Sequence, residues 1–271
     1  MGTYTESGIP PLIIVRGPEF YVCGADGSPN QWLKPKLSKR QGSFVFYDPN
    51  GRLLKRYGRT FSDNGYGVKV LNLKNIRMST RYNPVAYISD DKSAAKFAAA
   101  LTGSTKGMGR PGNINFIARE TMLLTALFSF LRDEAPDYEL NIHTISEMLG
   151  AMARNNEYSY PGCKTAVDIL FEHKEAADPE SLAVRKYNTF KEITGDFSIR
   201  RVVKSCAARI APLDTEEMRN FFSGDELALG DLYFCETAMF VIPGDPDAAA
   251  GFLAPLMYAQ LLDLLCEKSV R

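Results

Sequence analysis

The stretch from Gly42 to Ile88, GSFVFYDPNGRLLKRYGRTFSDNGYGVKVLNLKNIRMSTRYNPVAYI, decides the fold that we predict for this chain. Two short β-rich apolar runs, Ser43–Tyr47 and Val68–Leu73, flank an amphipathic segment from Arg52 to about Ser62. Strand, helix and strand within about thirty residues are typical of a βαβ unit, whose crossover we expect to be right-handed. The stretch therefore predicts a parallel sheet with a site at the carboxyl ends of its strands, where Asp48 would stand.

The chain before and after this stretch continues the α/β pattern. Leu12–Val15 is expected to be an edge strand and Phe20–Cys23 a second short strand. Near the other end, Glu236–Ile242 is again a β-rich apolar run, and the last helix, Gly251–Lys268, has a wide apolar face suited to packing on a sheet.

Between these parts the sequence shows helical periodicity only. A glycine-rich segment, residues 103–112, is expected to be a mobile linker, and helices follow from Asn113 to about Phe222. The helical part is therefore predicted to be inserted into one α/β domain. The expected division is an α/β domain formed by residues 1–102 and 230–271, and an all-α domain formed by residues 113–224.

Several pieces of the sequence resemble, in the same order, type IV secretion coupling proteins, the TraG/TraD-like ATPases of bacterial conjugation. The first pieces are GSFV..DP.G.L, GY.VKVLNL and S.RYNP.AYI, and ARETMLLTALFSFLRDEAP, DPESLAVRKYNTFKEITG, CAARIAP and ETAMFVIPGDPD follow. The resemblance extends from about Phe20 to Lys268. It implies a RecA-like, P-loop NTPase-type parallel sheet with an inserted all-α domain, and a role in conjugative DNA transfer.

The segment that matches the family's P-loop lacks the main charge of that motif. In the pattern G-x-x-x-x-G-K-[ST], backbone N–H groups cradle phosphates and the Lys reaches the β/γ oxygens. Here the equivalent reads CGADGSPNQWLKP, in which Asp26 adds a negative charge, Pro29 removes an N–H and the first Lys is Lys34. A plain turn is favoured over weak nucleotide binding. The residues of such a degenerate nucleotide site would be Gly24, Asp26, Gly27, Ser28, Asn30 and Asp48.

The resemblance also implies an acidic Walker B strand after the last helix, and the sequence ends at Arg271 before one. Without that acid, nothing obvious holds Mg²⁺ or positions the attacking water, so little or no ATP hydrolysis is expected. Asp48 lies in DPNGRL, where family members resemble DPKGEL, and is interpreted as a turn-forming residue and not as a metal ligand. No catalytic residue and no cofactor are predicted, with binding of ATP and Mg²⁺ as the alternative.

The only two histidines, His143 and His173, do not predict a metal site. Each stands alone on a helix or near its end, and the nearby acids Glu147 and Glu175 are typical of a solvated helix face.

One predicted helix, Phe197–Ile210, concentrates positive charge and has no acid after Asp196. Arg200 and Lys204 share a face at i, i+4 spacing. Such a patch can neutralise phosphates and so bind any DNA sequence with an affinity that depends on salt. The resemblance implies that the all-α domain recognises DNA and the transfer complex. For this helix, a solvated face that pairs with Asp214, Glu216 and Glu217 is slightly favoured over a binding patch. The candidate DNA- or partner-binding residues are Arg200, Arg201, Lys204, Arg209, Lys106 and Arg110.

The composition limits how the chain meets its partners. Among 271 residues, 32 acids balance 32 bases, so binding to nucleic acid must come from a local patch. The start MGTYTESGIP has no signal-peptide pattern, and no uninterrupted apolar run approaches about eighteen residues, so no membrane span is expected. We expect a soluble bacterial cytoplasmic protein, with attachment to the inner membrane through partners as a variant. The expected partners are single-stranded DNA, a relaxase complex or type IV secretion components.

Three functions are consistent with this sequence. The first is a shortened binding module of conjugative DNA transfer with little ATP hydrolysis. The second is a motor ATPase whose Walker B part lies outside this chain. The third is a structural remnant that displays the helical domain.

Overall fold

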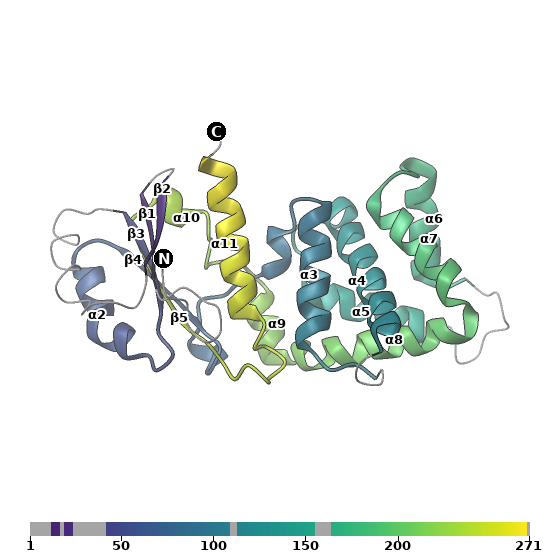
Figure 1. Ribbon diagram of the computed structural model, residues 1–271, viewed down its shortest axis with the longest axis horizontal. Helices are drawn as coiled ribbons and strands as arrows, with labels where there is room; N and C mark the ends of the chain where they lie inside the picture. The colour runs from purple at the N-terminus through teal and green to yellow at the C-terminus, as the bar shows by residue number, and fades with distance from the viewer. Residues whose placement is uncertain (1–11, 17–18, 24–41, 109–112, 155–163, 270–271) are drawn as a thin grey trace. The chain divides into compact units, whose positions relative to one another are not determined.

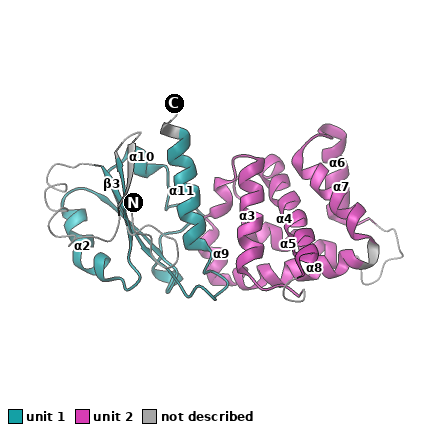
Figure 2. Cartoon of the chain, viewed as in Figure 1, with its two compact units in different colours: residues 1–82, 224–271 teal, residues 83–223 magenta. Residues whose placement is uncertain are grey.

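The computed structural model of the protein describes residues 12–16, 19–23, 42–108, 113–154 and 164–269 (Figure 1). The chain divides into two compact units (Figure 2). We call residues 1–82 with 224–271 the α/β unit, and residues 83–223 the helical unit. The expected end of the first α/β part, residue 102, lies within helix α3 (Asp91–Ser104), which belongs to the helical unit.

The described residues of the α/β unit form a five-stranded mixed sheet in the order β2-β1-β3-β5-β4. Strand β1 pairs antiparallel with β2 and β3, and β5 pairs parallel with β3 and β4, so only β1 runs against the other strands. The sheet is thus mixed, whereas the sequence had suggested a parallel sheet. The strands are β1 (Leu12–Arg16), β2 (Glu19–Cys23), β3 (Ser43–Tyr47), β4 (Gly67–Asn72) and β5 (Thr237–Ile242).

The prediction that Leu12–Val15 is an edge strand is wrong. The strand lies inside the sheet, with β2 on one side and β3 on the other. All four residues are buried, which agrees with a continuous apolar run being typical of a strand covered on both faces.

The predicted strand–helix–strand stretch is present, with a third strand between its two strands. Helix α2 (Arg52–Asp63) connects β3 to β4, and both strands are parallel to β5, which separates them. The register pairs Tyr47 with Val241 and Asn72 with Ile242. The carboxyl ends of three parallel strands therefore meet at one edge of the sheet.

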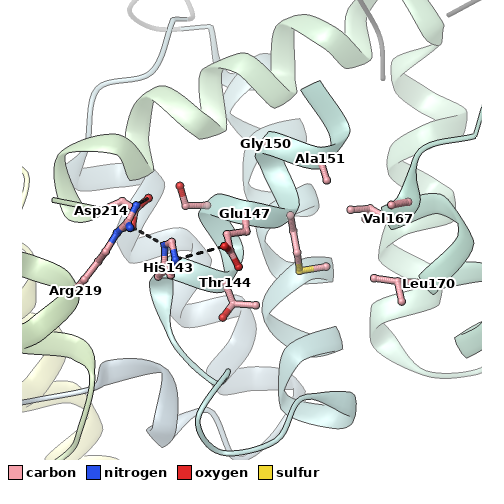
Figure 3. A pocket seen from close by; sticks show the side chains of 12 residues that line it. His143, Thr144, Glu147, Gly150, Ala151, Val167, Leu170, Asp214 and Arg219 are labelled. Atoms are coloured by element: carbon pink, nitrogen blue, oxygen red, sulfur yellow. Dashed lines mark hydrogen bonds and ion pairs between the residues drawn. The ribbon is translucent and has the colours of Figure 1, made fainter. Parts of the chain in front are cut away.

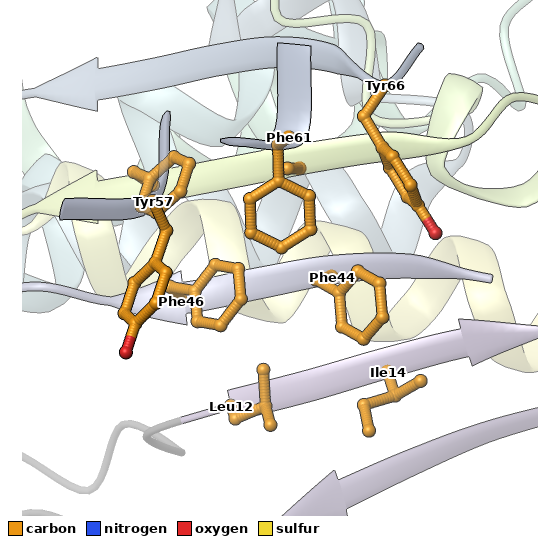
Figure 4. Packing of buried hydrophobic residues seen from close by; sticks show 9 residues of the cluster. Leu12, Ile14, Phe44, Phe46, Tyr57, Phe61 and Tyr66 are labelled. Atoms are coloured by element: carbon orange, nitrogen blue, oxygen red, sulfur yellow. The ribbon is translucent and has the colours of Figure 1, made fainter. Parts of the chain in front are cut away.

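An aromatic cluster attaches α2 to one face of the sheet (Figure 4). Phe44, Phe46 and Phe240 share this face because alternate side chains of a strand point the same way. Phe61 of α2 is fully buried among them, with its ring centroid 5.5 Å from that of Phe44 and 5.6 Å from that of Phe46. Large rings packed in this way contribute much of the stability of a small core, and they fix which side of α2 faces the sheet.

The other face of the sheet is buried as well. Ile13, Val45 and Met239 occupy the alternate positions of their strands and are fully buried. Helix α11 (Leu253–Ser269) lies on the side of the strands opposite α2, and its apolar residues, such as Leu261, are buried (Figure 1). The unit is completed by η1 (Ile76–Met78) and α10 (Asp231–Phe234).

The helical unit is built around α4 (Ile114–Glu134), which packs against α3, α7 and α8. Side chains cap several of its helices: for example, Asp90 caps α3, Thr165 caps α6 and Ser181 caps α7, each by accepting a bond from a backbone N–H of the first turn. The remaining elements are η2 (Pro84–Tyr87), α5 (Ile142–Arg154), α6 (Ala166–Ala177), α7 (Leu182–Thr194), α8 (Asp196–Ile210), η3 (Ala211–Leu213) and α9 (Glu216–Phe222).

Helix α4 is long and apolar enough to cross a membrane when it is judged by length and composition alone, with a mean hydropathy of 1.4. The expectation that the sequence holds no such stretch overlooked it, because Arg119 and Glu120 interrupt the apolar run. Within the protein, 61% of this stretch is buried, as in the central helix of a bundle.

Candidate nucleic-acid interface

Helix α8 directs three of its cations to the surface. Arg200, Arg201 and Lys204 are exposed, whereas Val202 and Val203 between them are fully buried. Because an α-helix repeats every 3.6 residues, Arg200 and Lys204 lie one turn apart on the same face and Arg201 lies beside them. These three residues form what we call the α8 basic face.

The loop that follows α3 brings another cation to α8. The backbone N–H of Met108 donates to Ser205 Oγ at 2.6 Å. Gly107 lies so close to the helix that an added Cβ would be only 2.5 Å from the same oxygen. Lys106, the next residue back along the loop, is exposed. The structure thus brings Lys106 to α8, while Arg110 lies outside the described residues.

The fourth predicted cation of α8, Arg209, is not on the surface. Its side chain is 5% exposed and pairs with Glu120, whose side chain is fully buried. Nη2 donates to Glu120 Oε2 at 2.7 Å and Nε donates to Oε1 at 3.0 Å. Nη1 donates to the carbonyl oxygens of Thr102, at 2.8 Å, and Thr105. Arg209 therefore joins α8 to α4 and to the end of α3, and it is removed from the predicted patch.

The position of Arg209 on the helix explains this correction. It follows Val202 and Cys206 at the spacing that places residues on one helical face, and both of these are fully buried. A count of charges along the helix does not separate this inward face from the outward one.

The residues that surround Arg209 were not predicted from the sequence. Ser205 Oγ donates to Glu120 Oε1 at 2.5 Å, so that Glu120, Ser205, Arg209 and Gly107 form one compact group that we call the buried polar cluster. The available signal was Glu120 itself, the only acid between Ile117 and Leu131. A lone carboxylate in such an apolar run requires a buried partner.

The predicted nucleotide site is described at one residue only, Asp48. Its side chain is 2% exposed, and Oδ2 accepts a bond from the N–H of Leu54 in the first turn of α2 at 2.9 Å. Its carbonyl accepts from Gly51 N–H at 3.1 Å, and its N–H donates to the carbonyl of Val241 at 2.8 Å. These are the bonds of a residue that holds a turn and starts a helix. Outside the described residues lie Gly24, Asp26, Gly27, Ser28 and Asn30.

A cavity of about 630 Å³ beside α5 is lined by another group of charged side chains in the helical unit (Figure 3). His143 Nδ1 is 2.9 Å from Asp214 Oδ1, and its Nε2 is 3.5 Å from Glu147 Oε1. Arg219 donates to both oxygens of Asp214, at 2.8 and 3.1 Å. Burial alone would raise the pKa of Asp214, but hydrogen bonds from Arg219, Ser146 and His143 outweigh it and lower the pKa.

These side chains satisfy one another, and the opposite wall of the cavity is apolar. Val167 and Leu170 of α6 lie across from α5 in Figure 3. Among the residues that the structure describes, no group of three or more His, Cys, Asp or Glu side chains has the geometry to hold a metal ion. Asp214, one of the acids in the alternative interpretation of the α8 basic face, pairs with Arg219.

The comparison with known families gives this surface a context. A family described as type IV secretory system conjugative DNA transfer matches residues 35–269, which is most of the chain. The chain belongs to this family. A search of curated proteins found no match. In a conjugative DNA-transfer protein, an exposed cationic helix face is a surface to be tested against DNA.

Proposed function

We propose that this conjugative DNA-transfer protein binds DNA through the α8 basic face together with Lys106. The observation that carries the proposal is the set of three exposed cations on one helix, with the Lys106 loop bonded to the same helix through Ser205. Because acids and bases balance over the whole chain, such a patch has to supply the attraction locally.

The kind of contact follows from the side chains. Arginine and lysine on a convex helix reach phosphates, and phosphate contacts carry no sequence information. The affinity should therefore be independent of sequence and should fall as salt is added. In a plot of log binding constant against log salt concentration, each neutralised phosphate of a single strand contributes about 0.7 to the steepness of the slope. A relaxase complex or a secretion component remains the other partner class for this face.

Fluorescence anisotropy with a labelled single-stranded oligonucleotide at several salt concentrations tests the proposal. The variant Arg200→Ala/Lys204→Ala should make this slope shallower by about 1.4, because two phosphate contacts are lost. Lys92→Ala/Lys96→Ala on α3 is the matched control, since these lysines are also exposed and one turn apart. Absence of binding at low salt, affinity that ignores salt, or equal slopes for the α8 variant and the control would refute the proposal.

We infer that ATP hydrolysis contributes little, and a motor ATPase completed by residues outside this chain is the second candidate. The common carboxyl edge of β3, β5 and β4 favours the ATPase, since ligands of open α/β sheets bind outside that edge. Titration calorimetry with ATP and Mg²⁺ separates the two. A Kd below about 100 μM together with phosphate release would establish the ATPase.

The finer fold assignment is also a proposal. We propose that the α/β unit corresponds to part of a RecA-like domain, into which the helical unit is inserted, in a protein of the bacterial cytoplasm. The supporting observation is that the chain leaves the α/β unit after Tyr82 and returns to it at Gly224. A protein that binds neither DNA nor nucleotide would instead be a remnant that displays the helical unit.

A further inference from the structure

Helix α2 in the α/β unit has a second concentration of positive charge. Arg52, Lys55, Arg56 and Arg59 are all exposed, and the one acid of the helix is Asp63 at its end. The spacing i, i+3, i+4 and i+7 places the four cations on a single stripe. From the first to the last, the stripe is about 10 Å long at 1.5 Å per residue. We call it the α2 stripe.

Little within the described part of the chain neutralises the α2 stripe. Arg59 Nε is 3.7 Å from Asp63 Oδ2, but these side chains are 91% and 66% exposed. Ion pairs this open to water contribute about 0–1 kcal/mol, so the arginine stays available to another anion. Arg56 lies over the ring of Tyr57, with its Cζ 5.4 Å from the centroid, which restrains its position.

The opposite side of α2 prevents the helix from turning this charge inward. Tyr57 and Phe61 are buried in the aromatic cluster, and Leu53 and Leu54 pack against it. The helix is thus held with its cations facing water. Its apolar side chains are also unavailable for insertion into a lipid bilayer.

A further cation lies at the start of the helix. Lys74, which is exposed, donates from Nζ to the carbonyl of Pro49 at 2.7 Å. Pro49 belongs to the turn directly before α2, so this ammonium group lies near the start of the helix.

We propose that the α2 stripe is a second surface for the DNA phosphate backbone, located on the α/β unit. It shares its partner with the proposed function but rests on a different helix. One strand of duplex DNA rises about 3.4 Å along the axis for each phosphate, so a stripe of about 10 Å is long enough to face more than one phosphate. Three of the four cations are arginines, whose planar fork pairs with phosphate oxygens through two hydrogen bonds.

DNA is a better occupant than a membrane surface for two reasons. A helix that binds a bilayer normally buries an apolar face at the interface, and that face of α2 is already packed on the sheet. In addition, the family to which the chain belongs acts in conjugative DNA transfer, which supplies DNA as the polyanion.

The test uses the full chain and the anisotropy titration described above. Arg52→Ala/Lys55→Ala removes two cations of the stripe. For a single strand, it should make the slope of log binding constant against log salt concentration shallower by about 1.4. Lys92→Ala/Lys96→Ala is again the matched control. Equal thermal unfolding midpoints for all variants would show that the changes in slope come from lost charge and not from unfolding.

The two surfaces can fail separately. If the α2 and α8 variants each lower the slope and their combination lowers it further, both surfaces contact DNA. If only the α8 variant does so, the proposal for α2 is wrong while the proposed function stands. If only the α2 variant does so, α2 binds DNA and α8 does not. A parent chain that floats with phosphatidylglycerol vesicles, loses this on Arg52→Ala/Lys55→Ala and ignores DNA would assign the stripe to membranes and overturn the proposal.

Discussion

Helices α2 and α8 both carry four basic residues, but they use them differently. All four cations of α2 are exposed, and the helix is held to the sheet by Tyr57, Phe61 and other apolar side chains. On α8 three cations are exposed, and the fourth, Arg209, is inside the helical unit with Glu120. Within the described part of the chain, α2 is therefore attached mainly by apolar packing, and α8 partly by a buried ion pair.

The difference shows that the face of a helix, and not the type of residue, decides what an arginine does. An exposed arginine can be removed with little effect on stability, whereas removal of a buried partner leaves an uncompensated charge in the core. Stability measurements should therefore separate the two kinds of arginine even though their sequence contexts are similar.

The largest effect is expected for Arg209→Ala. It leaves the Glu120 carboxylate buried without its main partner, which should lower the free energy of unfolding by about 3–5 kcal/mol. Arg200→Ala on the outer face of the same helix is the control and should change it by less than about 0.5 kcal/mol. Urea unfolding followed by circular dichroism measures both, and equal effects would mean that the comparison between the faces is wrong.

The same pair can be removed together to sharpen this result. Arg209→Met combined with Glu120→Leu replaces both charges by apolar side chains, and such replacements are often neutral or stabilising. The double variant should therefore be more stable than Arg209→Ala. If it is equally destabilised, the bonds of Arg209 to the carbonyls of Thr102 and Thr105 matter more than its pairing with Glu120.

Gly107→Ala should have the next largest effect. An added Cβ would be 2.5 Å from Ser205 Oγ, 2.6 Å from Glu120 Oε1 and 2.8 Å from Arg209 Nε. Each of these atoms is fixed by hydrogen bonds within the buried polar cluster, so none can shift freely. Overpacking of this kind lowers stability by about 1–3 kcal/mol.

Gly103→Ala is the control for Gly107→Ala, because it should raise stability where Gly107→Ala lowers it. Gly103 is in α3, and its added Cβ would meet nothing within 4 Å. Alanine at an open helical position stabilises by about 0.5–1 kcal/mol relative to glycine. Urea midpoints that move in the same direction for both variants would contradict the close contact at residue 107.

The sequence was sufficient for the elements that depend on local pattern. The bounds of β3 agree with the expected ones, and α2 and α8 differ from theirs by one residue at one end. What could not be predicted depends on contacts between distant segments. The position of β5 between β3 and β4 is one example, and the pairing of Glu120 with Arg209 is another.

For the candidate interface, helical periodicity predicts which cations of α8 share a face. The exposed Arg200 and Lys204 followed from their i, i+4 spacing. The same rule applied from Val202 would have placed Arg209 inward. The approach of the Lys106 loop to Ser205 could not be inferred, because a glycine-rich segment has no periodicity to interpret.

A smaller loss of stability is expected from substitution of Asp48, which bonds to the first turn of α2. Neither Gly51 before α2 nor Gly195 before α8 has a side chain that can cap its helix, but Asp48 accepts the N–H of Leu54 in the first turn of α2. Asp48→Ala should destabilise the protein by about 1 kcal/mol, as the loss of an N-terminal cap does. Asp48→Asn retains an oxygen acceptor and should lose less. If the two variants have equal urea midpoints, this bond does not stabilise the helix.

The smallest effect should be a dependence on pH at the pair of Asp214 and Arg219. Their side chains are 11% and 49% exposed, in contrast to the more deeply buried pair on α8. The folded-state pKa of Asp214 lies below its ordinary value, because the bonds from Arg219, Ser146 and His143 outweigh its burial. The unfolded chain therefore binds the proton more tightly, and Asp214 stabilises the fold above the unfolded pKa of about 3.9. This contribution, on the order of 1 kcal/mol or less for a pair so near water, should disappear as the pH falls through that value toward the folded pKa. Urea midpoints of the parent chain and Asp214→Asn should accordingly differ at pH 7 and approach each other as the pH falls below about 3.9, whereas Asp137→Asn at an exposed acid should match the parent throughout. A difference between the parent and Asp214→Asn that persists unchanged at the lower pH would mean that the substitution acts through the shape of the amide and not through the charge of the pair.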